Sequence, residues 1–254
     1  MVRRSVRRAA RVSGFLALTP TMLAAWSAHD AVTRKDRSAL RDRWFGAWCD
    51  AMLRVFGIRV ITVGEPPKRG AKLVVSNHRG VADVLVLLRT FGGHMVSRAD
   101  LAKWPLIGLA GRRLGTVFVD RSDIKSGAVT IRAMRHLLTD GETVTIFPEG
   151  TTFSGDDVRP FHAGGFVAAA GTGADVIPVG LAYSRDSQAA FGDETFVEHL
   201  GRMAAAPPSF VVVSIGEPLA LPTKSRDAAE RAREAVAREV GRAREEANRR
   251  DREA

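Results

Sequence analysis

Two side chains that could move a proton, His78 and Asp83, lie five residues apart in the stretch 77–83 (NHRGVAD). The stretch follows the apolar run 73–76, which predicts a buried strand, so His78 is expected at the carboxyl end of that strand. A helix starting near Asp83 would bring the carboxylate onto one ring nitrogen and leave the other free to accept a proton. The spacing predicts a general base; the alternative is a histidine that only caps the helix.

A second block carries a guanidinium. Arg121 follows the predicted strand 116–119, so it is expected at the same edge of the sheet as His78. A guanidinium can hold a phosphate or a carboxylate through two parallel hydrogen bonds. Arg121 is therefore predicted to bind an anionic ligand group; the alternative is a surface ion pair.

A third block follows the predicted strand 143–147, where proline and glycine force a sharp turn that carries Glu149, Gly150 and Thr151. A glutamate at this place could accept hydrogen bonds from a polar ligand. Exposed backbone N–H groups of the turn could stabilise an oxyanion. The alternative is an ordinary turn with a solvated carboxylate.

The elements that must position these blocks are strands alternating with helices from about residue 58 onward. Strands are predicted at 58–63, 73–76, 95–97, 116–119, 143–147, 176–183 and 210–215, and helices at 82–89, 101–114, 124–138 and 161–170. This alternation predicts an α/β fold with a mixed central sheet flanked by helices. Pro178 predicts that the strand 176–183 lies at an edge or contains a bulge.

The N-terminal part is basic and then apolar. The arginines at positions 3, 4, 7, 8 and 11 supply half of the net charge of +10, and the apolar run 14–26 follows them. This run contains Pro20 and is shorter than the roughly 20 apolar residues that a membrane-spanning helix needs. The pattern favours a helix lying in the headgroup region of an anionic membrane. A cleaved signal peptide and an amphipathic helix docked on the domain are the alternatives.

Two further helices complete the predicted domain organisation. Residues 33–56 place apolar side chains every four residues, with Trp44 and Trp48 interpreted as packed core. The Ala-, Arg- and Glu-rich tail 225–253 is predicted to be a solvated helix with few apolar anchors that frays. The predicted units are N-terminal helices at 1–56, an α/β domain at 57–222 and a charged C-terminal helix at 223–254.

Composition excludes several classes of protein. A length of 254 residues with 45% hydrophobic and 26% charged residues is typical of a globular chain, and one cysteine excludes an intramolecular disulfide framework. No cysteine–histidine cluster has the spacing of a structural zinc site. The positive charge suggests an anionic partner, but only 7% of residues are aromatic and no nucleic-acid-binding motif is present, which disfavours nucleic acid.

Taken together, these blocks resemble the glycerolipid acyltransferase family, which contains the 1-acylglycerol-3-phosphate acyltransferases. The family carries Asn-His-x4-Asp, a later block from glycine to arginine, Phe-Pro-Glu-Gly-Thr and a hydrophobic block with proline. Here these are found in the same order at 77–83, 115–121, 147–151 and 176–179. The resemblance spans about residues 55–218.

The resemblance implies roles for the site residues. His78 would be the general base and Asp83 its orienting partner, so that an acceptor hydroxyl attacks the thioester of acyl-CoA or acyl-carrier protein directly. Arg121 would bind the acceptor's phosphate, and Glu149, Gly150 and Thr151 would help to bind the acceptor. Neither a metal nor a resident cofactor is implied.

One departure from the family pattern bears on the acceptor. Many lysophosphatidate enzymes carry Phe-Lys-x-Gly after the third block, whereas this chain has FHAG at 161–164. The leading hypothesis is an enzyme at the cytoplasmic face of the cell membrane that acylates 1-acylglycerol-3-phosphate to phosphatidate. Lyso-ornithine lipid or another lysolipid is the alternative acceptor, and a membrane-surface lipid-binding protein is the alternative without enzymatic activity.

Overall fold

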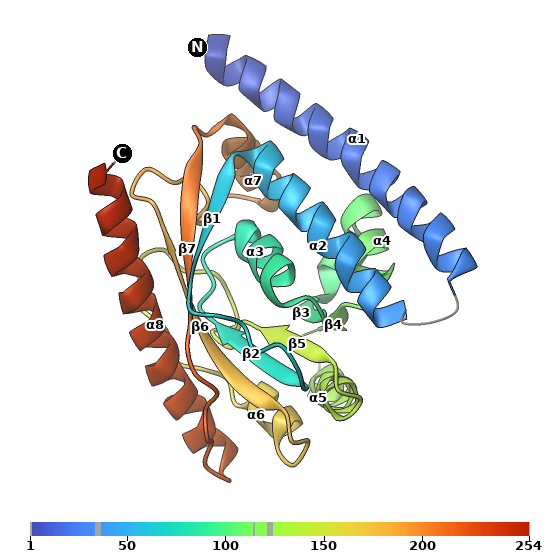
Figure 1. Cartoon of the computed structure of the whole chain (residues 1–254), viewed down its shortest axis with the longest axis vertical. Helices are drawn as coiled ribbons and strands as arrows, with labels where there is room; N and C mark the ends of the chain where they lie inside the picture. Colours follow the sequence, from blue (N-terminus) through green and yellow to red (C-terminus); the bar gives the residue numbers. More distant parts are fainter. Residues whose placement is uncertain (1, 34–36, 114, 121–123, 254) are drawn as a thin grey trace.

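The computed structural model describes residues 2–33, 37–113, 115–120 and 124–253 and has the predicted α/β fold. Within these residues, seven strands form one sheet (Figure 1). The strands are β1 (Ile58–Val63), β2 (Lys72–Ser76), β3 (His94–Arg98), β4 (Val117–Val119), β5 (Thr143–Ile146), β6 (Asp175–Tyr183) and β7 (Ser209–Ile215). The helices are α1 (Val2–Val32), α2 (Arg37–Phe56), α3 (Val81–Phe91), the 3-10 helix η1 (Ala99–Lys103), α4 (Pro105–Arg113), α5 (Ile124–Thr139), α6 (Gly164–Ala169), α7 (Phe196–Ala205) and α8 (Ser225–Glu253).

The sheet is mixed, with the order β1-β7-β6-β2-β5-β3-β4. β2 runs parallel to β5 and β6, and β3 runs parallel to β4 and β5, whereas β7 is antiparallel to β6 and parallel to β1. The carboxyl ends of β2, β5 and β6 therefore meet at one edge of the sheet, next to the amino ends of β1 and β7. The blocks at His78 and Glu149 both follow strands that end at this edge.

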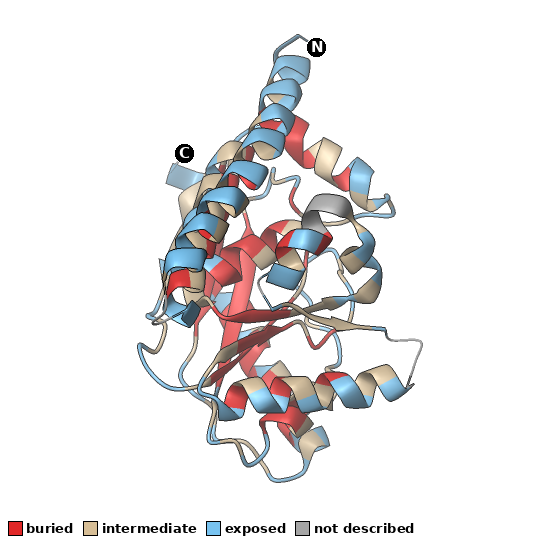
Figure 2. Cartoon of the chain, turned by 90° about the vertical axis from the view of Figure 1, so that its right-hand side faces the viewer, coloured by how far each residue is buried: buried red, intermediate tan, exposed pale blue. Residues whose placement is uncertain are grey.

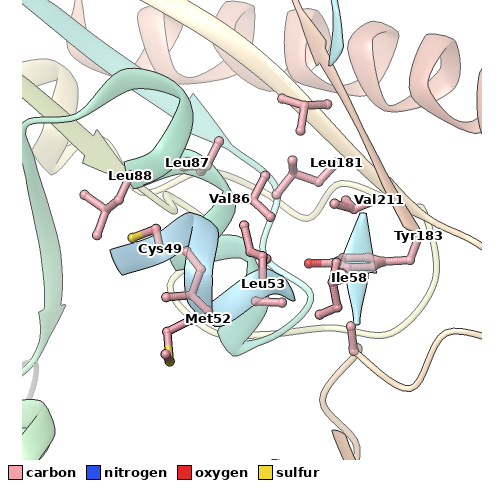
Figure 3. Close-up of a cluster of buried hydrophobic side chains, with 14 of the residues drawn as sticks. Cys49, Met52, Leu53, Ile58, Val86, Leu87, Leu88, Leu181, Tyr183 and Val211 are labelled. Atoms are coloured by element: carbon pink, nitrogen blue, oxygen red, sulfur yellow. The ribbon is translucent and has the colours of Figure 1, made fainter. Parts of the chain in front are cut away.

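Alternating side chains of the strands divide the core into two layers. Val74 packs with α2 and α3 on one face, whereas its neighbours Leu73 and Val75 pack with α5, α6 and α8 on the other. Buried residues accordingly occupy the central strands and the inner sides of the helices (Figure 2). Figure 3 shows part of the first layer, where Met52 and Leu53 of α2 meet Val86 and Leu87 of α3.

Helix α1 is continuous over 31 residues and passes through the exposed Pro20, which does not interrupt it. Its inner side packs on α2, where Trp26, Leu40 and Phe45 form a small buried cluster. The two tryptophans expected in the core, at positions 44 and 48, are partly buried against this cluster. None of the helices in the described residues is both long and apolar enough to cross a membrane.

Helix α1 is also fastened to the domain by a buried arginine. The Arg11 guanidinium donates hydrogen bonds of 3.2 Å and 2.7 Å to the carbonyl oxygens of Met203 and Ala206, at the carboxyl end of α7. Carbonyls at a helix end lack partners within the helix, so a cation is favourable there. One of the five N-terminal arginines, Arg11, is thus a structural residue that binds α1 to α7.

The expectation of a frayed, solvated C-terminal helix was wrong. α8 packs along β6 and β7 through buried small residues at helical spacing, which are Ala228, Ala229, Ala232, Ala235, Val236, Val240, Ala243 and Ala247. The approach is close at Gly180, where a Cβ atom would lie 2.2 Å from backbone atoms of Glu239 and Val240. Alanines supply little apolar area each, but they let the helix backbone reach the sheet.

Pro178 does not mark an edge strand, because β6 lies inside the sheet between β7 and β2. The alternative, a bulge, agrees with the pairing: Val179 lies opposite Ile215 but Val176 lies opposite Leu219, so two residues of β6 face three residues of the segment after β7. The pairing with β7 begins only at Val179, which lies opposite the last β7 residue, Ile215. Pro178 therefore has no β7 residue opposite it that would need a backbone N–H donor, and its carbonyl accepts from Gly216 at 2.9 Å.

Candidate active site

Asn77 fixes the chain where β2 ends. Its side-chain amide donates to the carbonyl oxygen of Leu181 at 2.9 Å and accepts from the Leu181 N–H at 2.8 Å. The side chain thus replaces a strand partner on β6 just beyond Ser76, and it is fully buried. This fixes the point from which His78 leaves the sheet.

The structure brings His78 and Asp83 together, as the spacing predicted. His78 Nδ1 lies 2.8 Å from Asp83 Oδ2, and the exposed fractions of the two side chains are 20% and 0%. Because a carboxylate only accepts, Nδ1 carries the hydrogen and Nε2 keeps a lone pair. The imidazole also stacks on Phe147, with ring centroids 3.9 Å apart and planes at 8°. The ring is therefore held on its edge and on one face.

Asp83 accepts hydrogen bonds from four groups. Besides His78, the backbone N–H groups of Arg79 and Gly80 donate to Oδ2 at 2.5 Å and 2.8 Å, and the Tyr183 hydroxyl donates to Oδ1 at 2.6 Å. Asp83 lies in the first turn of α3, where free N–H groups favour an anion. A buried carboxylate with this many donors is held in one orientation.

Gly80 is required by close packing at the start of α3. A Cβ atom at this position would lie 2.0 Å from the carbonyl oxygen of Ala189 and 3.4 Å from His199 Nε2. The turn that carries His78 is therefore pressed against the loop between β6 and α7. The hydrogen bond from the Phe191 N–H to the Arg79 carbonyl oxygen, at 2.6 Å, adds to this contact.

The structure also places Glu149 beside His78, but its carboxylate points into the protein. It accepts from the His78 backbone N–H at 2.7 Å, from Arg79 at 3.1 Å and from the Arg159 backbone N–H at 3.0 Å, and its side chain is 0% exposed. A second nitrogen of Arg79 donates to the carbonyl oxygen of Asp157 at 2.8 Å. Glu149 therefore joins the turn after β2 to the loop after β5, and its contact with an acceptor stays a prediction.

The two residues that follow differ from Glu149 in exposure. Gly150 has a φ of 84°, a left-handed conformation that suits glycine, and Thr151 is exposed. Loop 150–162 lies against the His78 turn, since the Phe153 N–H donates to the His78 carbonyl oxygen at 3.1 Å. His162, at the position of the family's lysine, is exposed.

Arg121, the predicted anion-binding residue, lies outside the described residues. The strand before it, β4, is present and pairs with β3, from Val96 opposite Val117 to Arg98 opposite Val119. The role of Arg121 therefore stays a prediction.

Two residues near the site were missed from the sequence. Tyr183 is the last residue of β6, and its alternation with Leu181, Val179 and Ile177 could have placed it on the same face of the sheet. Burial, and then the neighbouring Asp83, raises the pKa of Tyr183 well above its ordinary value, so its hydroxyl keeps its proton.

The other is His199 of α7. Its Nδ1 lies 2.9 Å from Glu194, its ring stacks on Phe191 at 4.3 Å, and its buried Nε2 has no hydrogen-bond partner among the described residues. Burial lowers the pKa of His199, so this histidine is neutral at neutral pH. No local motif identifies it, because its partners are brought together only by the fold.

An imidazole with a carboxylate on Nδ1 and a free Nε2, placed where parallel strands end, can take a proton from a substrate hydroxyl and return it to a leaving group. This fold and site have the arrangement of an α/β enzyme with a histidine–aspartate pair, and the catalytic role of His78 and Asp83 stays a prediction. The family model described as Acyltransferase matches residues 57–182. The chain belongs to this acyltransferase family, and it is an acyltransferase.

The relatives agree with this assignment. The chain is 33% identical to the lyso-ornithine lipid O-acyltransferase of Pseudomonas aeruginosa over 91% of this chain and 90% of that protein. It is 31% identical to the 1-acyl-sn-glycerol-3-phosphate acyltransferase of Neisseria gonorrhoeae over 48% and 49% of the two chains. The crystal structure of PlsC from Thermotoga maritima has the same fold, with a TM-score of 0.76 and 20% identity over 95% of this chain and 96% of that one.

Proposed function

We propose that this acyltransferase transfers a fatty acyl group from acyl-CoA or acyl-carrier protein to the free hydroxyl of a lysolipid. The observation that carries the proposal is the 2.8 Å contact between His78 Nδ1 and Asp83, which leaves Nε2 as the acceptor for the hydroxyl proton. The names of the relatives support a lysolipid as the acceptor. No resident cofactor enters the proposed reaction.

The proposed reaction has two steps. As the hydroxyl oxygen attacks the thioester carbonyl carbon, its proton passes to Nε2 of His78, and the buried Asp83 stabilises the imidazolium. The C–S bond then breaks, and the leaving thiolate takes the proton from Nε2. The products are the acylated lipid and the free thiol, and His78 is neutral again.

The leading acceptor is 1-acylglycerol-3-phosphate, which would yield phosphatidate. Arg121 is the proposed phosphate ligand, and the turn of Glu149, Gly150 and Thr151 is proposed to line the acceptor site. With its carboxylate already bonded inside the protein, Glu149 would act by fixing this turn, while the backbone beside Gly150 and the exposed Thr151 would face the acceptor.

Lyso-ornithine lipid is the second candidate acceptor. The relative that acts on it matches this chain over 90% of its own length, whereas the Neisseria lysophosphatidate enzyme matches over 49%. His162 also stands where many lysophosphatidate enzymes carry a lysine. An acceptor without a phosphomonoester needs no fixed cation at this position.

The proposed location is the cytoplasmic face of a membrane, with α1 as the part that contacts lipid. The segment from Val2 to His29 contains no acidic residue, and its exposed side chains include Arg3, Arg4 and Leu16. Basic and apolar side chains on one exposed helix favour an anionic lipid surface. Peripheral attachment requires no membrane-spanning helix.

The test is an assay of the purified full-length chain with acyl-CoA or acyl-carrier protein and a panel of lysolipids, including both acceptors named above. Thiol release and the acylated lipid are measured together. The wild-type chain should acylate at least one lysolipid, and His78→Ala should lose about a thousandfold or more in kcat while remaining folded. Equal turnover by the two chains would disprove the mechanism, and lipid binding without turnover by either would favour the non-enzymatic alternative.

A further inference from the structure

Within the part of the chain that the structure describes, two side-chain groups donate to Asp83, the His78 ring and the Tyr183 hydroxyl. The Tyr183 hydroxyl donates to Oδ1 at 2.6 Å, whereas His78 Nδ1 and the two backbone N–H groups all donate to Oδ2. The tyrosine ring is held in the core beside Leu53, Ile58 and Val211 (Figure 3). One carboxylate oxygen therefore serves the histidine and the other serves the tyrosine.

We infer that Tyr183 is a positioning residue of the acyl-transfer reaction: it orients the Asp83 carboxylate and sets how strongly that carboxylate supports a proton on His78. The inference rests on the proposed function, in which His78 is the base. Without the hydroxyl, Oδ1 loses the one donor that the described residues give it, and the carboxylate is held through Oδ2 alone.

The electrostatic effect has a defined direction. A hydrogen bond from the phenol withdraws negative charge from Asp83 and so weakens the attraction of the carboxylate for the imidazolium. Removing the hydroxyl leaves more charge on Asp83, which favours protonated His78. Since a general base must be unprotonated, the acidic limb of the kcat/KM profile should then move to higher pH.

The other charged and titratable groups around His78 and Asp83 do not take over the hydrogen bond of Tyr183 to Asp83. Arg79 and Glu149 form a buried ion pair on the loop side of His78. From α7, His199 faces Gly80 and is neutral at neutral pH because burial lowers its pKa. Tyr183 keeps its proton, because burial and Asp83 raise its pKa. The phenol thus acts as a hydrogen-bond donor throughout the working range of the enzyme.

The experiment compares Tyr183→Phe with the wild-type chain in the acyltransfer assay, with circular dichroism to verify the fold. We expect kcat to fall about tenfold, the rate effect of one hydrogen bond, while the KM values for both substrates stay close to wild type. The acidic limb of kcat/KM should move to higher pH. A loss of packing alone would not move this limb.

A second variant tests a shift of the acidic limb in the opposite direction and keeps the Tyr183 hydroxyl. Tyr183 is the only tyrosine of the chain, so biosynthetic incorporation of 3-fluorotyrosine alters this residue alone. Ring fluorination makes the phenol a stronger donor, and the acidic limb should then move to lower pH. The fluorotyrosine protein tests whether the Tyr183 hydroxyl sets the acidic limb even if Tyr183→Phe fails to fold.

The matched control is Ser214→Ala, which also removes a buried hydroxyl that donates to a carboxylate, here Glu239 at 2.5 Å between β7 and α8. Its kcat and acidic limb should equal those of the wild type. Wild-type kinetics in Tyr183→Phe, or limbs that move in the same direction in both tyrosine variants, would overturn the inference. Undiminished activity of His78→Ala in the same assay would instead overturn the proposed function.

Discussion

At the scale of single residues, the candidate site is held by side chains that bond to backbone on distant segments. Asn77 bonds to both backbone groups of Leu181, and Glu149 bonds to the backbone N–H groups of His78 and Arg159. Such contacts fix the position of the turn that carries His78. They make the location of the imidazole depend on the turn after β2, the loop after β5 and strand β6, which are far apart in the sequence.

Replacing Glu149 by glutamine tests whether the loop after β5 helps to fix the position of the His78 imidazole. Glu149→Gln leaves the buried Arg79 without its counter-charge, which should lower the free energy of unfolding by about 3 kcal/mol. Because the His78 turn and the turn proposed to line the acceptor site both lose part of their support, kcat should fall and the KM for the acceptor should rise together. Chemical denaturation and steady-state kinetics measure the two effects.

The control for this substitution is Glu65→Gln, which makes the same chemical change at an exposed position and should alter neither stability nor kcat. An acceptor KM that rises in Glu149→Gln, with kcat and stability unchanged, would mean that the carboxylate binds the acceptor directly. The measurement therefore separates a role in holding the turn from a role in binding.

At the scale of elements, the close contact between α8 and β6 depends on the absence of a side chain at Gly180. Gly180→Ala would place a Cβ atom 2.2 Å from the backbone of α8, so the helix must move, at a cost of about 3 kcal/mol. At Gly241, in α8 itself, a Cβ atom would meet no atom of the other described elements within 4 Å, so Gly241→Ala should stabilise the protein by about 1 kcal/mol. Thermal denaturation of both variants measures this difference, and equal effects would refute the close packing.

The buried His199 of α7 should make the free energy of unfolding depend on pH. Burial lowers the pKa of this histidine below its unfolded value of about 6.5, so only the unfolded chain gains this proton as the pH falls below that value. Stability should therefore decrease from pH 7 toward pH 5, with a slope of at most about 1.4 kcal/mol per pH unit from this group. Urea denaturation over this range measures the slope.

His199→Asn removes the titrating group and should flatten this part of the profile. His162→Asn, at an exposed position, should retain the wild-type slope. Glu194 adds a second acidic loss at lower pH, since hydrogen bonds from Arg202 lower its pKa to about 2. The stability that ionised Glu194 contributes should be fully present above about pH 4.5 and should be lost as the pH falls toward 2. This loss occurs at lower pH than the change attributed to His199. An unchanged slope in His199→Asn would contradict the assignment.

Most elements could be predicted because their patterns are local. All seven predicted strands are found with ends shifted by at most one residue, and the contact of His78 with Asp83 followed from their spacing. The inward direction of Glu149, the hydroxyl of Tyr183 and the packing of α8 could not be predicted in this way. Each depends on a partner brought close by the order of the strands, and local spacing does not determine that order.

At the scale of the whole molecule, the arginines lie in different surroundings and have different roles. Arg11 and Arg79 are buried and hold helices and loops, while four arginines of α8, at positions 233, 242, 249 and 250, form ion pairs with glutamates of the same helix. α1 and α8 lie on opposite sides of the sheet (Figure 1). Exposed positive charge without neighbouring acidic residues is thus concentrated at the start of α1.

This distribution predicts which charges contribute to lipid binding. Neutralising Arg3 and Arg4 together, by Arg3→Gln and Arg4→Gln, should weaken binding to vesicles containing anionic lipid by about 2 kcal/mol, or about 30-fold. The matched control, Arg226→Gln with Arg252→Gln on α8, removes the same charge from exposed positions and should bind like the wild type. Vesicle co-sedimentation at two salt concentrations measures both. Equal weakening by the two pairs would mean that net charge, rather than α1, directs the protein to lipid.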